Sequence, residues 1–168
     1  MRAVIIGYYG GRNFGDECIL EGILHSLKTM NPSFTPIVST LDENHTARIH
    51  NVLTLPTFAR NPVKFIRGLL MADCVIVGGG GHAWQESISL LSITVPALLG
   101  VVLGRPAFFL SIGVDPPINQ TNRAILMATL RLASLLSVRD NLSANYLSQM
   151  GLKPLITPDP AFLYLAIR

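Results

Sequence analysis

The chain has 168 residues, of which 49% are hydrophobic and only 14% are charged, and its formal net charge is +3. This length favours a single domain over residues 1–168, and the mean hydropathy of +0.44 predicts that part of the surface faces a partner. The basic residues are scattered along the chain, so we expect no nucleic-acid partner, which would require a concentrated basic stripe. The two cysteines, Cys18 and Cys74, have no CxxC spacing, which favours a reducing, cytoplasmic location.

Short apolar runs alternate with helical patterns along the whole chain. Six strands are predicted, at Arg2–Ile6, Thr35–Ser39, Cys74–Val77, Ala107–Ser111, Leu135–Val138 and Pro154–Thr157. Five helices are predicted between them, at Glu17–Met30, Pro62–Leu70, Glu86–Leu103, Arg123–Ala133 and Asn141–Met150. This alternation indicates an α/β fold, a Rossmann-like three-layer domain with a mainly parallel sheet. In such sheets ligands collect at the carboxyl ends of the strands.

The apolar segment 88–110 is the candidate for a membrane span. Pro96, Gly100 and Arg105 interrupt it, so a helix buried in the fold or against a partner is favoured over a spanning helix. Peripheral contact with the inner face of a membrane is an alternative.

The first glycine-rich segment, GYYGGRNFGDE, lies between the first strand and the first helix. Its backbone N–H groups and the positive end of the helix face the carboxyl ends of the strands, where an anionic ligand is stabilised. Its spacing matches neither the dinucleotide nor the P-loop pattern. Asp16 is a candidate catalytic carboxylate, although it could simply cap the helix. The candidate substrate-binding residues are Gly10, Gly11, Asn13, Gly15 and Glu17.

A second cluster, Gly78–Gly81, ends the third predicted strand. Four consecutive glycines cost backbone entropy, which indicates that a ligand or a second backbone passes close by, or that the chain makes a wide turn. Gly79, Gly80 and Gly81 are therefore candidate substrate-binding residues. His82 and Glu86 are too few to predict a metal site, and we expect none.

Arg139 stands at the end of the fifth predicted strand, so its guanidinium is a candidate grip for a phosphate or a carboxylate. The alternative is a structural pair with Asp140 or Asp159. Asp140 is also placed to cap the next helix through Ser143.

Five segments, in order, resemble the N-terminal half of the polysaccharide pyruvyl transferase family. They are Gly7–Leu20, Ala72–Gly81, Asn122-Arg123, Leu135–Leu152 and Asp159–Phe162. The resemblance implies two Rossmann-like domains that face a cleft, as in glycosyltransferases of the B type. It also implies transfer of a pyruvyl group from phosphoenolpyruvate to two sugar hydroxyls as a cyclic ketal, during the synthesis of a cell-surface glycan.

By the same resemblance, Asp16 matches the general base for the acceptor hydroxyl, and Arg139 matches an arginine that holds the anionic donor. No cofactor is implied beyond the donor substrate, phosphoenolpyruvate. The implied partners are a sugar or lipid-linked glycan acceptor and a second domain or partner chain, because members of the family are roughly twice this length. The aromatic side chains of Tyr8, Tyr9 and Trp84 would stack on a sugar or belong to the core.

The chain departs from the family pattern after its second glycine cluster, where it reads His82-Ala83-Trp84-Gln85-Glu86, and in the turn Gly113-Val114-Asp115-Pro116. Three alternative functions therefore stay open. They are a glycosyltransferase-like domain that binds a nucleotide sugar, a non-catalytic binding or assembly module and, least favoured, an NAD-dependent dehydrogenase.

Overall fold

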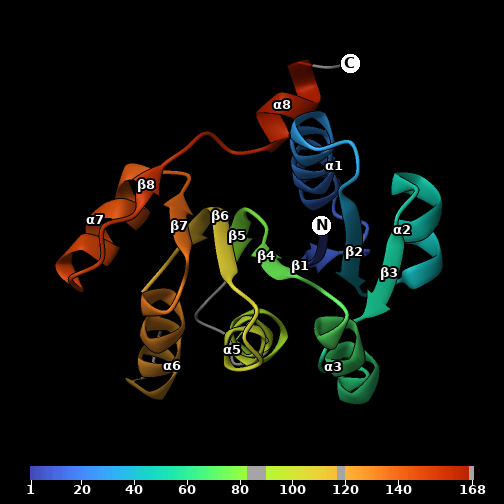
Figure 1. The fold of residues 1–168 in the computed structure, drawn as a ribbon. Coiled ribbons are helices and arrows are strands. Elements are labelled where there is room, and N and C mark those ends of the chain that lie inside the picture. Colours follow the sequence, from blue (N-terminus) through green and yellow to red (C-terminus); the bar gives the residue numbers. More distant parts are fainter. Residues whose placement is uncertain (83–89, 117–119, 167–168) are drawn as a thin grey trace.

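The computed structural model describes residues 1–82, 90–116 and 120–166, and within them eight strands form one sheet (Figure 1). The strands are β1 (Arg2–Tyr9), β2 (Thr35–Thr40), β3 (Leu53–Pro56), β4 (Cys74–Val77), β5 (Gly80–His82), β6 (Ala107–Val114), β7 (Leu135–Val138) and β8 (Leu155–Ile156). The helices are α1 (Phe14–Met30), α2 (Glu43–His50), α3 (Pro62–Leu70), a π-helical segment (Leu90–Thr94), α5 (Val95–Val102), α6 (Gln120–Arg131), α7 (Asn141–Gln149) and α8 (Ala161–Ala166).

The strand order is β3-β2-β1-β4-β6-β7-β8, and β5 pairs with the far end of β6. Every pairing is parallel. The chain runs outward from β1 to β3, then returns to β4 on the other side of β1 and continues to β8. The direction of winding therefore reverses between β1 and β4, which is where open α/β sheets bind their ligands.

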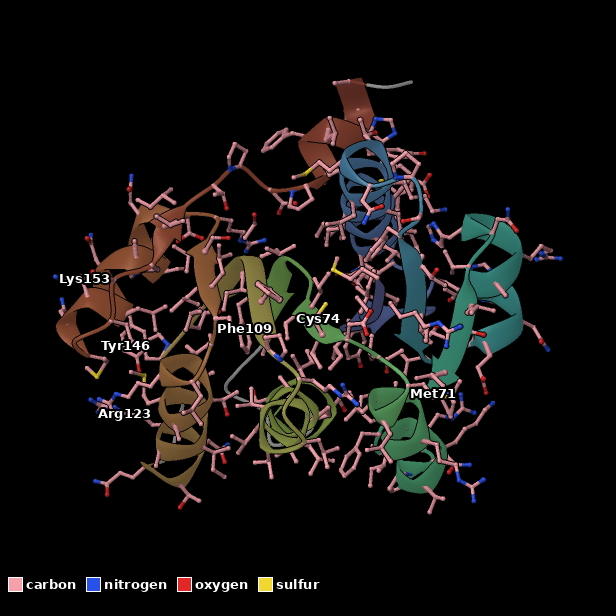
Figure 2. All side chains as sticks on the ribbon, in the orientation of Figure 1. Met71, Cys74, Phe109, Arg123, Tyr146 and Lys153 are labelled. Atoms are coloured by element: carbon pink, nitrogen blue, oxygen red, sulfur yellow. The ribbon has the colours of Figure 1, made fainter. Side chains whose placement is uncertain are left out.

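Helices cover both faces of the sheet, with α1 and α8 on one face and α3, α5 and α6 on the other (Figure 1). Alternate residues of β1 point to opposite faces. Ala3 and Ile5 join the core cluster beneath α1, whereas Val4 and Ile6 join the cluster that contains Phe65 of α3. Figure 2 shows side chains filling the space between the sheet and the helices, with Cys74 and Phe109 in the interior.

The predicted α/β fold and all six predicted strands are confirmed, and so are the predicted helices at α1, α3, α6 and α7. Helix Glu86–Leu103 is confirmed from Leu90 onward as the π-helical segment and α5, and residues 86–89 lie outside the described residues. The structure adds four elements that the sequence analysis does not predict, namely α2, β3, β5 and α8.

The apolar segment 88–110 contributes α5 and the start of β6. Pro96, Ala97 and Gly100 of α5 are buried in the fold, as the sequence analysis favours. In the part of the chain that the structure describes, none of the helices combines the length and the apolar composition needed to cross a bilayer.

Candidate functional site

The candidate site lies at the carboxyl ends of the central strands. β1 ends at Tyr9 and leads into the loop before α1, and β4 ends at Val77 beside the second glycine cluster. Arg139 follows β7, and its backbone N–H donates to the carbonyl of Ile112 in β6. The parallel sheet thus brings three of the segments that the sequence analysis singles out to one edge of the sheet.

Asp16 stands in the first turn of α1, but it does not cap the helix. The N-cap is Asn13, whose side-chain oxygen accepts a hydrogen bond from the backbone N–H of Gly15 at 3.0 Å. Asp16 is half-buried, and its carboxylate makes no hydrogen bond or ion pair with any described residue. The capping interpretation is therefore wrong, and this carboxylate is available for another role.

The surroundings of Asp16 make it more basic than an ordinary aspartate. Burial raises the pKa of its carboxyl group, and the nearby carboxylates of Glu17 and Asp159 raise it further. A half-buried carboxylate with a raised pKa and no partner among the described residues has the properties of a general base.

Asp159 joins this site from the segment between β8 and α8. One carboxylate oxygen accepts a hydrogen bond from the backbone N–H of Ala161 at 3.0 Å, and the other lies 3.6 Å from Nη1 of Arg139. Asp159 thus interacts with both predicted catalytic residues, because its charge raises the pKa of Asp16 and its oxygen contacts Arg139.

The segment that carries Asp159 is fixed to β6 by Ser111. This residue has the left-handed φ of +52° at an irregularity in the strand, a conformation that costs about 1 kcal/mol or more outside glycine. Its hydroxyl lies 2.8 Å from the hydroxyl of Thr157 and donates to the carbonyl of Pro158 at 2.9 Å. The strained residue therefore sets the position of the segment that delivers Asp159.

The Arg139 side chain lies close to the carboxylates of Asp140 and Asp159 and to the backbone of Gly113. Its Nε is 3.5 Å from Oδ2 of Asp140, and a Cβ atom added at Gly113 would lie only 2.8 Å from the same Nε. The structural pairing that the sequence analysis proposes as an alternative is thus present with both aspartates. At these distances, and with the Arg139 side chain 36% exposed, the pairs orient the guanidinium and contribute little stability. They leave it able to meet an anion.

Asp140 confirms the predicted helix cap. Its carboxylate accepts a hydrogen bond from the backbone N–H of Ser143 at 2.7 Å at the start of α7. This bond is the main cause of the lowered pKa of Asp140.

Tyr9 belongs to the core, and its ring explains two of the glycines. A Cβ atom at Gly7 would lie 2.4 Å from the ring of Tyr9, and one at Gly78 would lie 1.8 Å from its hydroxyl. The hydroxyl is buried and has no hydrogen-bond partner among the described residues. Burial raises the pKa of the Tyr9 phenol above its usual range, and the nearby carboxylates of Asp16, Glu17 and Asp159 raise it further. Tyr8 is 45% exposed, and its contact with a sugar stays a prediction.

Glu17 has structural partners, in contrast to Asp16. Its Oε1 accepts the backbone N–H of Gly10 at 2.9 Å, and its Oε2 lies 2.7 Å from Nε2 of His50. The other ring nitrogen of His50 lies 2.7 Å from Glu21. Gly10 itself has a φ of +74° and leaves no room for a side chain beside Thr40. These contacts tie the loop before α1 to α2.

The remaining predicted binding residues fall into two groups. Gly11 and Gly15 have room around their backbones, as a ligand-facing glycine requires. Gly80 and Gly81 form β5 and pair with Ile112 and Gly113 of β6, and a Cβ atom at Gly79 would lie 3.0 Å from the carbonyl oxygen of Ser111. Contact of any of them with a substrate stays a prediction. Trp84 and Glu86 lie outside the described residues.

The sequence offers the pair of Arg139 with Asp159 as an alternative, but it predicts neither the effect of Asp159 on the pKa of Asp16 nor the role of His50. His50 carried no signal, because nothing in the sequence connects it with Glu17 and Glu21, which lie about 30 residues earlier.

The fold and the site define a Rossmann-like α/β domain in which the predicted catalytic carboxylate and arginine both follow strands at the carboxyl edge of the sheet. The sequence profile of the family described as polysaccharide pyruvyl transferase matches residues 13–167. The chain therefore belongs to the polysaccharide pyruvyl transferase family, which is a family of transferases.

Among solved structures, the chain is similar to the 2.2 Å crystal structure of a Listeria monocytogenes protein provisionally assigned as a UDP-N-acetylglucosamine 2-epimerase. The TM-score is 0.57 at 12% sequence identity, over 92% of this chain and 43% of that protein. The likeness supports the fold, and this chain spans less than half the length of its structural neighbour. A search of curated proteins gives no match.

Proposed function

We propose that this chain is the acceptor-side half of a polysaccharide pyruvyl transferase. The observation that carries the proposal is made at the carboxyl edge of the sheet, in a chain of this family. There Asp159 contacts Arg139, and its charge raises the pKa of Asp16. Asp16 has a raised pKa and no structural partner, and Arg139 offers a partly exposed cation. These are the groups that activation of a hydroxyl and capture of an anionic donor require.

In this reaction Asp16 takes the proton of one acceptor hydroxyl, and the oxygen forms a bond with the central carbon of phosphoenolpyruvate. The methylene carbon of the donor takes a proton from a donor-side acid and becomes a methyl group, and Asp16 releases its proton to solvent, which restores that acid. The second hydroxyl then forms the other C–O bond of the ketal while the C–O bond to phosphate breaks, and its proton leaves with the phosphate. Arg139 stabilises the negative charge of the donor carboxylate or phosphate.

We also propose that a second domain or a partner chain closes over this edge and supplies the remaining donor-side groups. Large apolar side chains stand exposed on α1 and α8, with Phe14 71%, Phe162 67% and Leu165 65% accessible. Exposed apolar groups gathered near a site are typical of an interface. The acceptor in this proposal is a sugar or a lipid-linked glycan. Cys18 and Cys74 are both buried and neither forms a disulfide, which supports a reducing, cytoplasmic location, at the inner face of the membrane if the acceptor is lipid-linked.

Calorimetric titration of the chain with phosphoenolpyruvate tests this proposal. We expect saturable binding that weakens roughly tenfold or more in Arg139→Gln, because a charge-assisted hydrogen bond is lost. Arg67→Gln is the matched control, since Arg67 is an exposed arginine on α3. Circular dichroism would establish that both variants are folded.

Equal binding by Arg139→Gln and Arg67→Gln would contradict the role of Arg139. Binding of a UDP-sugar in place of phosphoenolpyruvate would instead favour the glycosyltransferase-like alternative. A chain that binds neither ligand, and that forms a stable complex without turnover, would be a non-catalytic module.

A further inference from the structure

A pocket of about 530 Å³ lies between the first turn of α1, α2 and α8. Its walls include Arg12 and Phe14 before and at the start of α1, His45 and Arg48 on α2, and Tyr164 on α8. Asp16 is not part of its lining, although the neighbouring Glu17 is. The volume falls within the range of small-ligand pockets in proteins.

Three of the lining residues form a brace of side-chain contacts between His50 of α2 and two glutamates of α1. His50, whose side chain is 3% exposed, contacts Glu17 through Nε2 and Glu21 through Nδ1, each at 2.7 Å. Glu17 also accepts the backbone N–H of Gly10. The two carboxylates are therefore engaged within the protein, and the brace fixes α1 against α2 so that the walls of the pocket are held in place.

The cations at the rim are in the opposite situation. Arg12 and Arg48 are both exposed, and neither side chain makes a hydrogen bond or ion pair with any residue in the described part of the chain. The ring of His45 has no such partner there either. Two guanidinium groups therefore line one pocket, and neither pairs with a carboxylate of the described residues. Such a site attracts an anion.

Apolar surface adjoins these cations. Phe14 is 71% exposed and packs edge-on against Tyr164 with ring centroids 6.2 Å apart, and Ile49 is 53% exposed. Exposed aromatic surface is costly to leave in water, and the flat face of a sugar ring is a suitable cover for it. Free phosphate alone would use the arginines and leave this surface open.

We infer that the pocket binds the phosphate-linked sugar of a glycan acceptor, with the phosphate on Arg12 and Arg48 and the sugar against Phe14. The ligand class is a sugar 1-phosphate or its diphosphate-linked form. Its identification as the acceptor rests on the proposed function, because Glu17 of the pocket adjoins Asp16 in the first turn of α1. The binding itself does not depend on that function.

Calorimetric titration with glucose 1-phosphate, glucose and inorganic phosphate tests the inference on the chain as it is. We expect glucose 1-phosphate to bind the wild type more tightly than glucose or inorganic phosphate does. Its affinity should fall roughly tenfold or more in Arg12→Gln and in Arg48→Gln. Arg67→Gln removes the same charge from α3 and should bind like the wild type. Arg139→Gln should also bind glucose 1-phosphate normally while losing phosphoenolpyruvate, so that failure of this inference and failure of the proposed function are distinguishable.

Several results would overturn the inference. They are an absence of saturable binding, an equal loss in Arg67→Gln, and a loss in Arg139→Gln that Arg48→Gln does not share. Amide NMR shifts provide a second readout, and changes centred on α1 and α2 support the pocket, whereas changes centred on β7 contradict it. Competition by UDP-glucose and by a prenyl-diphosphate-linked glucose distinguishes a nucleotide carrier from a lipid carrier, and displacement by neither contradicts a carrier-linked ligand.

Discussion

Two adjacent carboxylates in the first turn of α1 have opposite surroundings. Asp16 is half-buried, makes no hydrogen bond or ion pair with the described residues, and has a raised pKa. Glu17 is held by Gly10 and by His50 of α2. The sequence presents them as one acidic pair, whereas in the structure only the second carboxylate has partners among the described residues.

This difference shows how a helix can serve chemistry and stability at the same turn. Successive residues of a helix point about 100° apart, so neighbours in the sequence face different parts of the fold. Two adjacent carboxylates in a motif therefore need not share a role. Substitutions around Glu17 and around Asp16 should have separate effects.

The largest expected change in stability follows from removing His50, the shared partner of Glu17 and Glu21. His50→Ala leaves the carboxylates of Glu17 and Glu21 without their shared partner, and we expect a loss of about 3 kcal/mol in the free energy of unfolding. Urea denaturation at neutral pH measures this loss. His25→Ala, an exposed histidine on α1, is the control and should change stability little. Similar stabilities for the two variants would contradict the brace.

The second prediction concerns the packing of Gly78 against Tyr9. Gly78→Ala places a Cβ atom in the position of the Tyr9 hydroxyl, so we expect a loss of about 2 kcal/mol. Tyr9→Phe removes that oxygen and should recover part of the loss in the double variant, since the two residues are in contact. Gly15→Ala is the control, because its Cβ atom would meet nothing closer than 3.4 Å. Additive effects of the Gly78 and Tyr9 changes would refute the contact.

A smaller effect is expected at the cap of α7. Asp140→Ala should cost about 1 kcal/mol at neutral pH, and Asp140→Asn should retain most of the cap. The hydrogen bond from Ser143 lowers the pKa of Asp140 in the folded protein. Its ionised form therefore stabilises the fold above the ordinary value of 3.8, and this contribution disappears as the pH falls through the lowered value. Thermal unfolding as a function of pH measures the contribution, and an Asp140→Ala penalty that persists in strong acid would be inconsistent with it.

Asp16 should give the smallest change in stability, with the opposite sign. Its pKa is raised in the folded protein, so ionisation of Asp16 destabilises the fold above that pKa and has no effect below the ordinary value of 3.8. Asp16→Asn should therefore stabilise the protein at neutral pH and leave its stability unchanged near pH 3. Carboxyl NMR titration should also show a lower Asp16 pKa in Asp159→Asn. An Asp16 pKa at or below its ordinary value would exclude the basic carboxylate.

The sequence predicts most of the sheet because its central strands are continuous apolar runs that are buried on both faces. It does not predict α2, since the buried side of that helix consists of Thr46 and His50 in place of apolar residues. β5 escapes prediction because two of its three residues are glycines, which leave no side-chain pattern.

The candidate site could be predicted only in part, for a related reason. Asp16 and Arg139 are predicted because they come after strands, and a parallel topology places the carboxyl ends of these strands at one edge of the sheet. The pair of Asp159 with Arg139 is only an alternative at the level of the sequence, because it depends on the anchoring of the preceding segment by Ser111. The strained conformation of Ser111 has no local sequence pattern that predicts it. The brace at His50 joins residues far apart in the chain and depends on the packing of α2.

The central claim is that Asp16 is the base that activates the acceptor hydroxyl. The most direct measurement is the rate of pyruvyl transfer from phosphoenolpyruvate to a sugar acceptor, by this chain together with the domain or subunit that completes the enzyme. Asp16→Asn should lower kcat roughly 100-fold or more without loss of folding. Asp73→Asn is the matched control at the opposite end of the sheet, where Asp73 accepts the backbone N–H of Arg2, and it should retain turnover. Unchanged turnover in Asp16→Asn would contradict the account.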